Sequence, residues 1–284
     1  MMIYYNQFKF YSLMIFCFLS VMNLAQAKPK IVTTISPVAG IITMLTGDSA
    51  EVIALNTNGG CPHHYHLKPS DLKHVNDADI IIYIDEKFDG EIIKLSKKSN
   101  ARLIRISDNK QINFMDGAGN INYHFWLDLN NILPLQQQVS QALIKLMPEM
   151  KQTLMANQAK ALQDINALML LKNDELKHFS ELIVVSDSLE HFFKNTKLNI
   201  IKAYSSEHAS LQNYSKLEQI LKTDKSQCIV LDLEQNIDIY KKFSKTIAQI
   251  DSENWQINER RIDHNFYFNQ YIKIINQLKS CRGV

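Results

Sequence analysis

Three histidines, His63, His64 and His66, lie within four residues of one another in the segment NGGCPHHYHLKPSD, residues 58–71. The glycines and prolines of this segment disfavour a regular helix or a central strand, so we expect the histidines on a loop. Neutral imidazole is a common ligand of zinc-like ions, but a site needs about three or four donors and one loop seldom supplies them all. The segment therefore predicts part of a metal site, with His63 as its strongest ligand. The alternative is a chance cluster of exposed histidines.

Three further polar points fall where predicted strands or loops end. His124 lies in the segment YHFW, Ser186 and Asp187 follow one apolar run, and Asp263 and His264 follow another. Imidazole nitrogens and carboxylate oxygens both bind divalent ions. A lone histidine among apolar residues is more often hydrogen-bonded in a core, and a lone carboxylate more often caps a turn. However, two of the four polar points lie in each half of the chain, as a metal ion held between two lobes requires.

The elements that must position these residues alternate between strands and helices. Apolar, β-branched runs predict strands over residues 30–35, 51–55, 80–84, 102–106, 181–185, 198–204, 228–233 and 257–262. Helical spacing lies between most of these runs. The alternation favours an α/β fold with two lobes, each a mainly parallel sheet flanked by helices, and such sheets bind ligands at the carboxyl ends of their strands.

A segment from Pro148 to about Phe179 contains no glycine or further proline and is rich in Ala, Leu, Lys, Gln and Met. It predicts one long helix of about 45 Å, because each residue adds about 1.5 Å. Its apolar residues hold no clean heptad, so we expect a rigid connection between lobes rather than a coiled coil. The predicted organisation is a signal peptide at 1–27, an N-terminal metal-binding lobe at 28–147, the connecting helix at 148–179 and a C-terminal lobe at 180–284.

The first 27 residues differ in composition from the rest of the chain. They carry Lys9 as their only charge, an apolar run at 13–24 and the small-x-small sequence Ala25-Gln26-Ala27. These features predict a signal peptide cleaved after Ala27 and a periplasmic location. A membrane anchor is the alternative, but an apolar run of about a dozen residues is shorter than the roughly 20 that a spanning helix needs. The formal net charge of +2 argues against binding of nucleic acid.

Of the four cysteines, Cys17 would be removed with the signal peptide, which leaves Cys61, Cys228 and Cys281 in an oxidising compartment. A Cys228–Cys281 pair would close a loop of about 50 residues and stabilise the fold by about 4 kcal/mol on the chain-entropy account. Cys61 would then be the odd thiol. We favour a plain small loop residue there over a sulfur ligand.

Together these residues resemble the metal-binding solute-binding proteins of ABC importers for zinc and manganese, most closely the periplasmic zinc-uptake type. The segment PHHYHLKPSDLKHVNDADIIIYI at 62–84 resembles the family's first-ligand block, P-H-x-Y or P-H-x-F followed by x-P-S/T-D, with His63 at the ligand position. YHFWLD resembles D-P-H-x-W-L-S/D and makes His124 the second ligand. RIDHN resembles the L-D-P block and puts Asp263 at the acidic ligand position. The resemblance covers nearly the whole mature chain.

The chain departs from the family pattern at the third ligand. The family has H-D-A-F-x-Y-F for zinc or S-E-x-x-x-x-Y-F for manganese, whereas this chain has VSDSLEHFF. One register puts Ser186, a poor donor, at this position, and a shift by one puts Asp187 there. Water or another histidine could complete the site instead; the candidates are His64, His66, His191, His208 and His264. A second departure is the absence of a histidine-rich loop, since residues 109–122 contain no histidine.

The resemblance implies two α/β lobes joined by a rigid long helix, with one metal ion in the cleft and a Cys228–Cys281 disulfide. It implies a monomeric binding protein, not an enzyme, that delivers a divalent ion, zinc rather than manganese or iron, to an inner-membrane ABC permease. The alternatives are a degenerate relative with weak metal binding and a secreted metallohydrolase. Against the hydrolase, the sequence contains neither H-E-x-x-H nor G-x-S-x-G.

Overall fold

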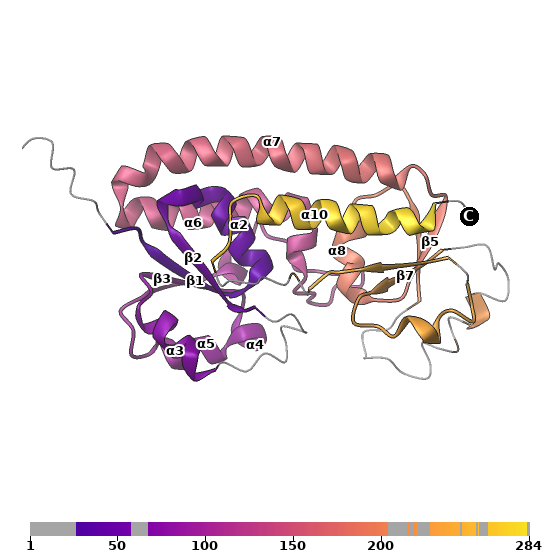
Figure 1. Ribbon diagram of the computed structural model, residues 1–284, viewed down its shortest axis with the longest axis horizontal. Helices are drawn as coiled ribbons and strands as arrows, with labels where there is room; N and C mark the ends of the chain where they lie inside the picture. Colours follow the sequence, from indigo (N-terminus) through magenta and orange to yellow (C-terminus); the bar gives the residue numbers. More distant parts are fainter. Residues whose placement is uncertain are drawn as a thin grey trace, which may run out of the picture.

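Two parallel β-sheets lie at opposite ends of the protein beneath one long helix (Figure 1). The computed structural model describes residues 27–57, 68–203, 215, 218–220, 228–244, 246–253, 255 and 261–282. Within this part, the four-stranded sheets have the orders β2-β1-β3-β4 and β6-β5-β7-β8. The prediction of an α/β fold with two lobes and a connecting long helix is confirmed. No helix among the described residues is both long and apolar enough to cross a membrane.

The first sheet is apolar on both faces, because helices cover both of them. Its strands are β1 (Lys30–Ile35), β2 (Glu51–Asn56), β3 (Ile80–Tyr83) and β4 (Arg102–Arg105). Its helices are α2 (Ser36–Thr46), α3 (Pro69–Asn76), α4 (Glu86–Asp89), α5 (Glu91–Ser96) and α6 (Ile132–Leu146). Val32 pairs with Ile53 and Ile81 on the face that packs against α3 and α5. Their neighbours along each strand point into the main core, as expected for a parallel sheet buried on both sides.

The second sheet is built from four strands of four residues each. They are β5 (Glu181–Val184), β6 (Asn199–Lys202), β7 (Ile229–Asp232) and β8 (Ile247–Ile250), with α8 (Glu190–Phe193) after β5 and α10 (Phe266–Gln277) after β8. Strand β8 lies upstream of the last strand predicted from the sequence, at 257–262. Residues 256–260 are outside the described part, and Arg261 forms an isolated bridge to Ile53 of the first lobe. The edge strand is therefore the short IAQI run, with Ala248 and Ile250 buried.

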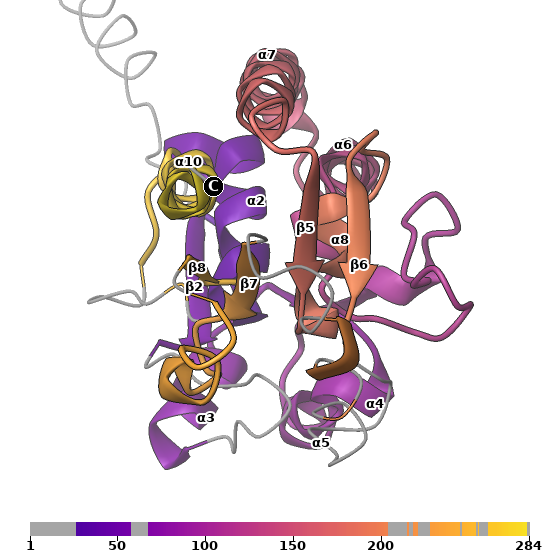
Figure 2. The same ribbon diagram turned by 90° about the vertical axis from the view of Figure 1, so that its right-hand side faces the viewer.

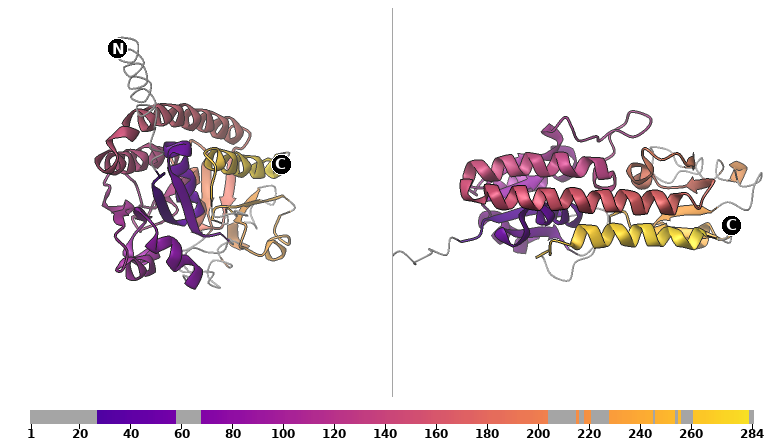
Figure 3. Two further views of the ribbon diagram at one scale, coloured as in Figure 1. Left: turned by 60° about the vertical axis from the view of Figure 1, so that its left-hand side comes forward. Right: turned by 90° about the horizontal axis from the view of Figure 1, so that it is seen from above.

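Helix α7 (Lys151–Leu176) packs against α2, α6 and α10 and supports both lobes (Figure 3). A 3₁₀ turn at Pro148–Met150 precedes it, so the helical segment matches the predicted one to within a few residues. Its buried stripe includes Leu154, Ala161, Ile165 and Leu168. These residues belong to one hydrophobic core that contains residues of both sheets. Moving the lobes apart would expose this core to water, so α7 resists lobe separation.

Helix α10 packs beside α2 (Figure 2) and bonds to the turn that follows His124. A side chain at Gly40 of α2 would meet Phe266 at 2.9 Å and Tyr267 at 3.2 Å, so glycine permits the two helices to approach closely. The Tyr267 hydroxyl donates to the Trp126 carbonyl at 2.6 Å, and the Tyr271 hydroxyl donates to the Leu127 carbonyl at 2.8 Å. A helix late in the sequence therefore supports a loop of the first lobe.

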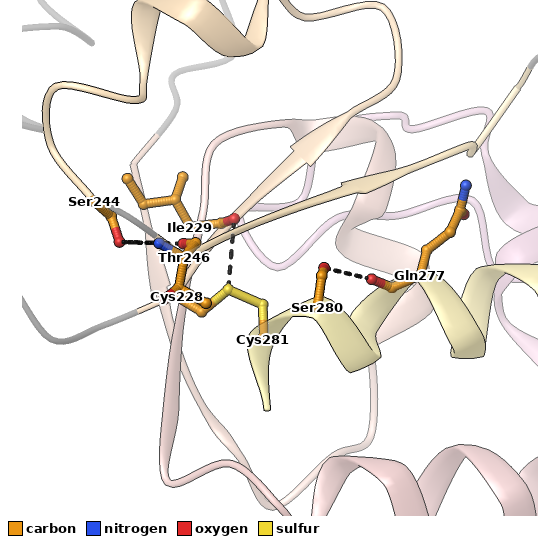
Figure 4. The surroundings of a disulfide bond; sticks show 7 residues. All are labelled: Cys228, Ile229, Ser244, Thr246, Gln277, Ser280 and Cys281. Carbon is orange, nitrogen blue, oxygen red and sulfur yellow. Dashed lines mark hydrogen bonds between the residues drawn. A yellow bond between two sulfur atoms is a disulfide. The ribbon is translucent and has the colours of Figure 1, made fainter. Parts of the chain in front are cut away.

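A disulfide joins Cys228, before β7, to Cys281, at the end of the 3₁₀ turn that follows α10 (Figure 4). The two Cα atoms lie 5.5 Å apart and the cysteines are separated by 53 positions. Both residues are buried. The predicted pairing is confirmed, and it fastens the C-terminal helix to the second sheet.

Candidate metal centre

The three clustered histidines, His63, His64 and His66, lie outside the described residues, as do Cys61 and His208. Strand β2 ends at residue 56 and the chain is described again from 68, at the start of α3. Their role as ligands therefore stays a prediction.

His124 is buried, with 7% of its surface exposed, and lies just before the 3₁₀ turn Phe125–Leu127. Asn122 Oδ1 accepts two hydrogen bonds from it, one from the backbone N–H at 3.0 Å and one from ring Nδ1 at 2.7 Å. An amide oxygen can only accept, so Nδ1 carries a proton. The other ring nitrogen, Nε2, contacts Glu253 Oε1. The His124 nitrogen that would bind a metal ion therefore faces a carboxylate of the second lobe.

Glu253 follows β8, and its side chain is 8% exposed. Trp126 Nε1 donates to the Ser252 carbonyl at 2.9 Å, and Ser36 Oγ donates to the Trp255 carbonyl at 2.7 Å. These bonds fix the loop on both sides of the glutamate. Sequence reasoning missed Glu253 because it missed β8. The available signal was an alternating IAQI run followed at once by Asp251-Ser252-Glu253, just as Ser186-Asp187 follow the run of β5.

The electrostatic surroundings of His124 favour its charged form. Burial disfavours the imidazolium and would lower the pKa of His124, but the facing Glu253 carboxylate outweighs burial and the pKa is raised. Asp187 and Asp232 add to the effect. The second lobe therefore creates a negative potential at Nε2, which would attract a cation.

Ser186 and Asp187, the candidates for the third ligand, follow β5 at the same edge of the second sheet. Ser188 Oγ donates to Asp232 Oδ2 at 3.1 Å, so Ser186 Oγ must donate to Ser188 Oγ, 2.7 Å away. Ser252 Oγ also donates to Asp232. Burial raises the pKa of Asp232. Ser186 is half-buried and Asp187 is exposed. This edge therefore offers oxygen atoms from the ends of three strands.

Asp263 and His264, predicted from the R-I-D-H-N segment, are both exposed. Asp263 Oδ1 accepts the Asn265 N–H at 2.7 Å, and its carbonyl accepts from Thr43 Oγ1 at 3.1 Å. Helix α2 begins at Ser36, directly after β1, and Thr43 lies seven residues further along it. At about 1.5 Å per residue, Thr43 is about 10 Å from the end of β1. The described hydrogen bonds of Asp263 are therefore to α2 and to Asn265, and its role as a ligand stays a prediction. Asp263 lies in the turn before α10, and Glu253 is the acidic residue that faces His124.

His191 on α8 is a buried core histidine. Its Nε2 donates to the Asn122 carbonyl at 3.0 Å. Burial lowers the pKa of His191 to about 4, so the ring is neutral at pH 7. Among the residues that the structure describes, no group of three or more His, Cys, Asp and Glu side chains is arranged to hold a metal ion. The described part of the centre is the pair His124 and Glu253.

The chain is similar in sequence to metal-binding proteins of bacterial importers. Residues 31–281 match the model of the family described as ZnuA, zinc-uptake complex component A, periplasmic. The uncharacterized protein RP014 of Rickettsia prowazekii (strain Madrid E) is 40% identical over 257 residues, which cover 90% of this chain and 84% of RP014. The iron ABC transporter substrate-binding lipoprotein MtsA of Streptococcus pyogenes serotype M1 is 28% identical over 181 residues, 58% of each chain.

Solved structures share the fold at low sequence identity. The crystal structure of ZnuA superposes with a TM-score of 0.72 at 17% identity, covering 90% of this chain and 99% of that one. This likeness concerns the arrangement of the two lobes and the long helix.

Proposed function

Because the chain belongs to the family of periplasmic zinc-uptake component A proteins, metal-binding substrate-binding proteins of ABC importers, we propose that it captures one zinc ion in the periplasm and delivers it to an inner-membrane ABC permease. Members of this family are binding components of importers and not enzymes, so the zinc ion is cargo. We propose that the protein acts as a monomer.

One observation carries the proposal: His124 Nε2 of the first lobe faces the Glu253 carboxylate of the second. An imidazole nitrogen and a carboxylate oxygen are both zinc ligands. Zinc would replace the proton that this pair shares in the metal-free protein, and the ion would then bridge the two lobes. The carboxylates of Asp187 and Asp232 would help to neutralise its charge.

We propose His63 as the second imidazole ligand, from the segment that follows β2. Parallel strands place the residues that follow them at the same edge of a sheet. The third-ligand position would be filled by Ser186 or, through its carboxylate, Asp187. His64 and His66 remain spare donors. We leave Asp263 out of the proposed site, because its described hydrogen bonds are to Asn265 and Thr43.

The choice of ion has a second candidate. Second-lobe oxygens from Glu253, Asp187 and Asp232 favour manganese or iron, which prefer oxygen ligands more than zinc does. The family match and the paired imidazoles favour zinc. A competition titration of residues 28–284, with zinc and manganese at equal concentration, tests the assignment. We expect one zinc ion to bind per chain and to displace manganese; preferential binding of manganese would overturn the assignment of zinc.

The proposed location depends on export. Residues 1–27 would be removed as a signal peptide, so the mature chain would begin at Lys28. Mass spectrometry of the protein purified from the periplasm of an expressing bacterium should give a mass that begins at Lys28, whereas a mass that retains residue 1 would contradict export by cleavage.

A further inference from the structure

Asn122 connects the two lobes at the point where they meet. It is 8% exposed. Its backbone N–H donates to the Phe114 carbonyl at 2.7 Å, and its own carbonyl accepts from His191 Nε2 at 3.0 Å. Its side-chain oxygen accepts from His124, and its Nδ2 donates to the Asp187 carbonyl at 2.8 Å. Every polar group of this residue is therefore used, and two of its partners belong to the second lobe.

The hydrogen bonds fix which way the amide points. A backbone N–H can only donate, so the atom that meets the His124 N–H must be the amide oxygen. The Asp187 carbonyl can only accept, so the atom that meets it must be the amide nitrogen. A flipped amide would break bonds at both ends. The second lobe thus holds the amide oxygen toward Nδ1 of His124.

We propose that Asn122 is a positioning residue that locks the His124 ring with its proton on Nδ1 and its Nε2 toward the metal ion. The proposal rests on the proposed function, in which His124 binds the ion. Partners of this kind commonly fix the tautomer and orientation of metal-binding histidines. An amide does so without adding a negative charge behind the ring, so the charge at this centre stays on the Nε2 side, where Glu253 lies.

The loop that carries Asn122 has other attachments to the second lobe. The Gly117 N–H donates to Glu190 Oε1 at 2.6 Å, and Lys194 Nζ donates to the Met115 carbonyl at 3.0 Å. These bonds do not involve the Asn122 side chain. Truncation of this side chain should therefore leave the loop docked and the protein folded, which makes a test by substitution practical.

One variant at this position and one control isolate the role. Asn122→Ala removes the acceptor for Nδ1. Asn120→Ala removes an exposed amide of the same loop that bonds to Asp116 and not to His124. Thermal unfolding of each variant checks that it is folded.

Two measurements on the mature protein report how the His124 ring binds a metal ion. The first is NMR of ¹⁵N-histidine-labelled protein loaded with cadmium-113, in which one-bond coupling identifies the nitrogen that binds the metal. The second is zinc affinity by competition with a chelator. We expect coupling to Nε2 of His124 in wild type and in Asn120→Ala. For Asn122→Ala we expect zinc affinity about 10 to 100-fold lower. We also expect the coupling to Nε2 to be lost or to be split between Nε2 and Nδ1 of His124.

The outcomes separate this inference from the proposed function. If Asn122→Ala binds zinc as wild type does with unchanged Nε2 coupling, the positioning role is overturned. If cadmium shows no coupling to His124 even in wild type, the metal site itself is wrong. In that case the Nδ1 proton of metal-free protein still tests positioning: it should exchange with water faster in Asn122→Ala than in wild type.

Discussion

The two lobes share a sheet topology but bring different chemistry to the place where they meet. In each sheet the strands follow the same order, with the first strand between the second and the third. The first lobe contributes the imidazole of His124, whereas the described donors of the second lobe are oxygens, from Ser186 after β5, Asp232 at the end of β7 and Glu253 after β8. The shared topology thus explains where polar residues gather, and the residue types at the strand ends explain what each lobe can bind.

The lobes also differ in how they are stabilised. Strands β1 and β2 have six residues each, whereas every strand of the second sheet has four. The smaller sheet is the one joined to α10 by the Cys228–Cys281 disulfide. A covalent link therefore compensates for limited strand pairing in the lobe that supplies the oxygen donors.

Removal of the disulfide should have the largest effect on stability. A Cys228→Ser, Cys281→Ser double variant frees a loop of 53 residues, and we expect about 4 kcal/mol lower free energy of unfolding on the chain-entropy account. Urea unfolding measures this loss, with Cys61→Ser as a control that keeps the link. A loss below about 1 kcal/mol would mean that the second lobe does not depend on its disulfide.

Acid should destabilise the contact between the lobes through His191. Its pKa is about 4 in the folded protein, against about 6.5 unfolded, so the unfolded chain binds the extra proton between these values. Its contribution to stability is complete above pH 6.5 and falls by up to about 3 kcal/mol as pH drops toward 4. His191→Gln, which can still donate to the Asn122 carbonyl, should lose less stability over that range in urea unfolding. Parallel curves for the two proteins would contradict this account.

Much of the fold follows from the sequence because its elements are marked locally. The first lobe's strands are dense in β-branched residues, and a helix without glycine or further proline after Pro148 is hard to mistake. The disulfide was suggested by the family resemblance. Strand β8 was missed because IAQI is short and has only two isoleucines, and its place depends on pairing with β7.

The metal centre is only partly predictable from the sequence, because it depends on strand β8, which has a weak local pattern. The YHFW segment identifies His124 as a candidate ligand. Its acidic partner can be identified only if the strand of the second lobe that ends next to His124 is known. A final strand predicted at 257–262 gives Asp263 the position that Glu253, after β8, occupies in the structure. Asn122 lies at the Asp of the family's D-P-H pattern, two residues before His124. Its contacts with residues 65 and 69 positions away, which hold it in place, depend on the fold.

The difference between Glu253 and Asp263 can be tested directly. Glu253→Gln removes a carboxylate charge that faces His124 and should lower zinc affinity by about 100-fold, the upper range for groups around a metal. Asp263→Asn, its matched control in the exposed turn before α10, should change affinity by less than about twofold, because its effect is that of a surface substitution. Chelator competition at pH 7.5 compares them. The reverse order of effects would restore Asp263 as the acidic ligand.

A smaller effect is expected from pH on zinc affinity. Because the Glu253 carboxylate raises the pKa of buried His124, a proton competes more strongly for its metal-binding nitrogen than it would at an ordinary histidine, and zinc must displace it. From pH 7.5 to 5.5 we expect affinity to fall at least about tenfold, by proton competition. Isothermal titration at both pH values measures this difference, and equal affinities would rule out proton competition at His124.

The central claim is that one ion is held between His124 and Glu253, and a double-mutant cycle of zinc affinity tests it most directly. The variants are His124→Ala, Glu253→Gln and their combination, with His178→Ala, an exposed histidine, as control. If both residues bind one ion, each single variant loses about 100-fold and the double variant loses far less than the product of about 10,000-fold, because the partners are coupled. Losses that multiply, or a His124→Ala variant with wild-type affinity, would contradict a shared ion.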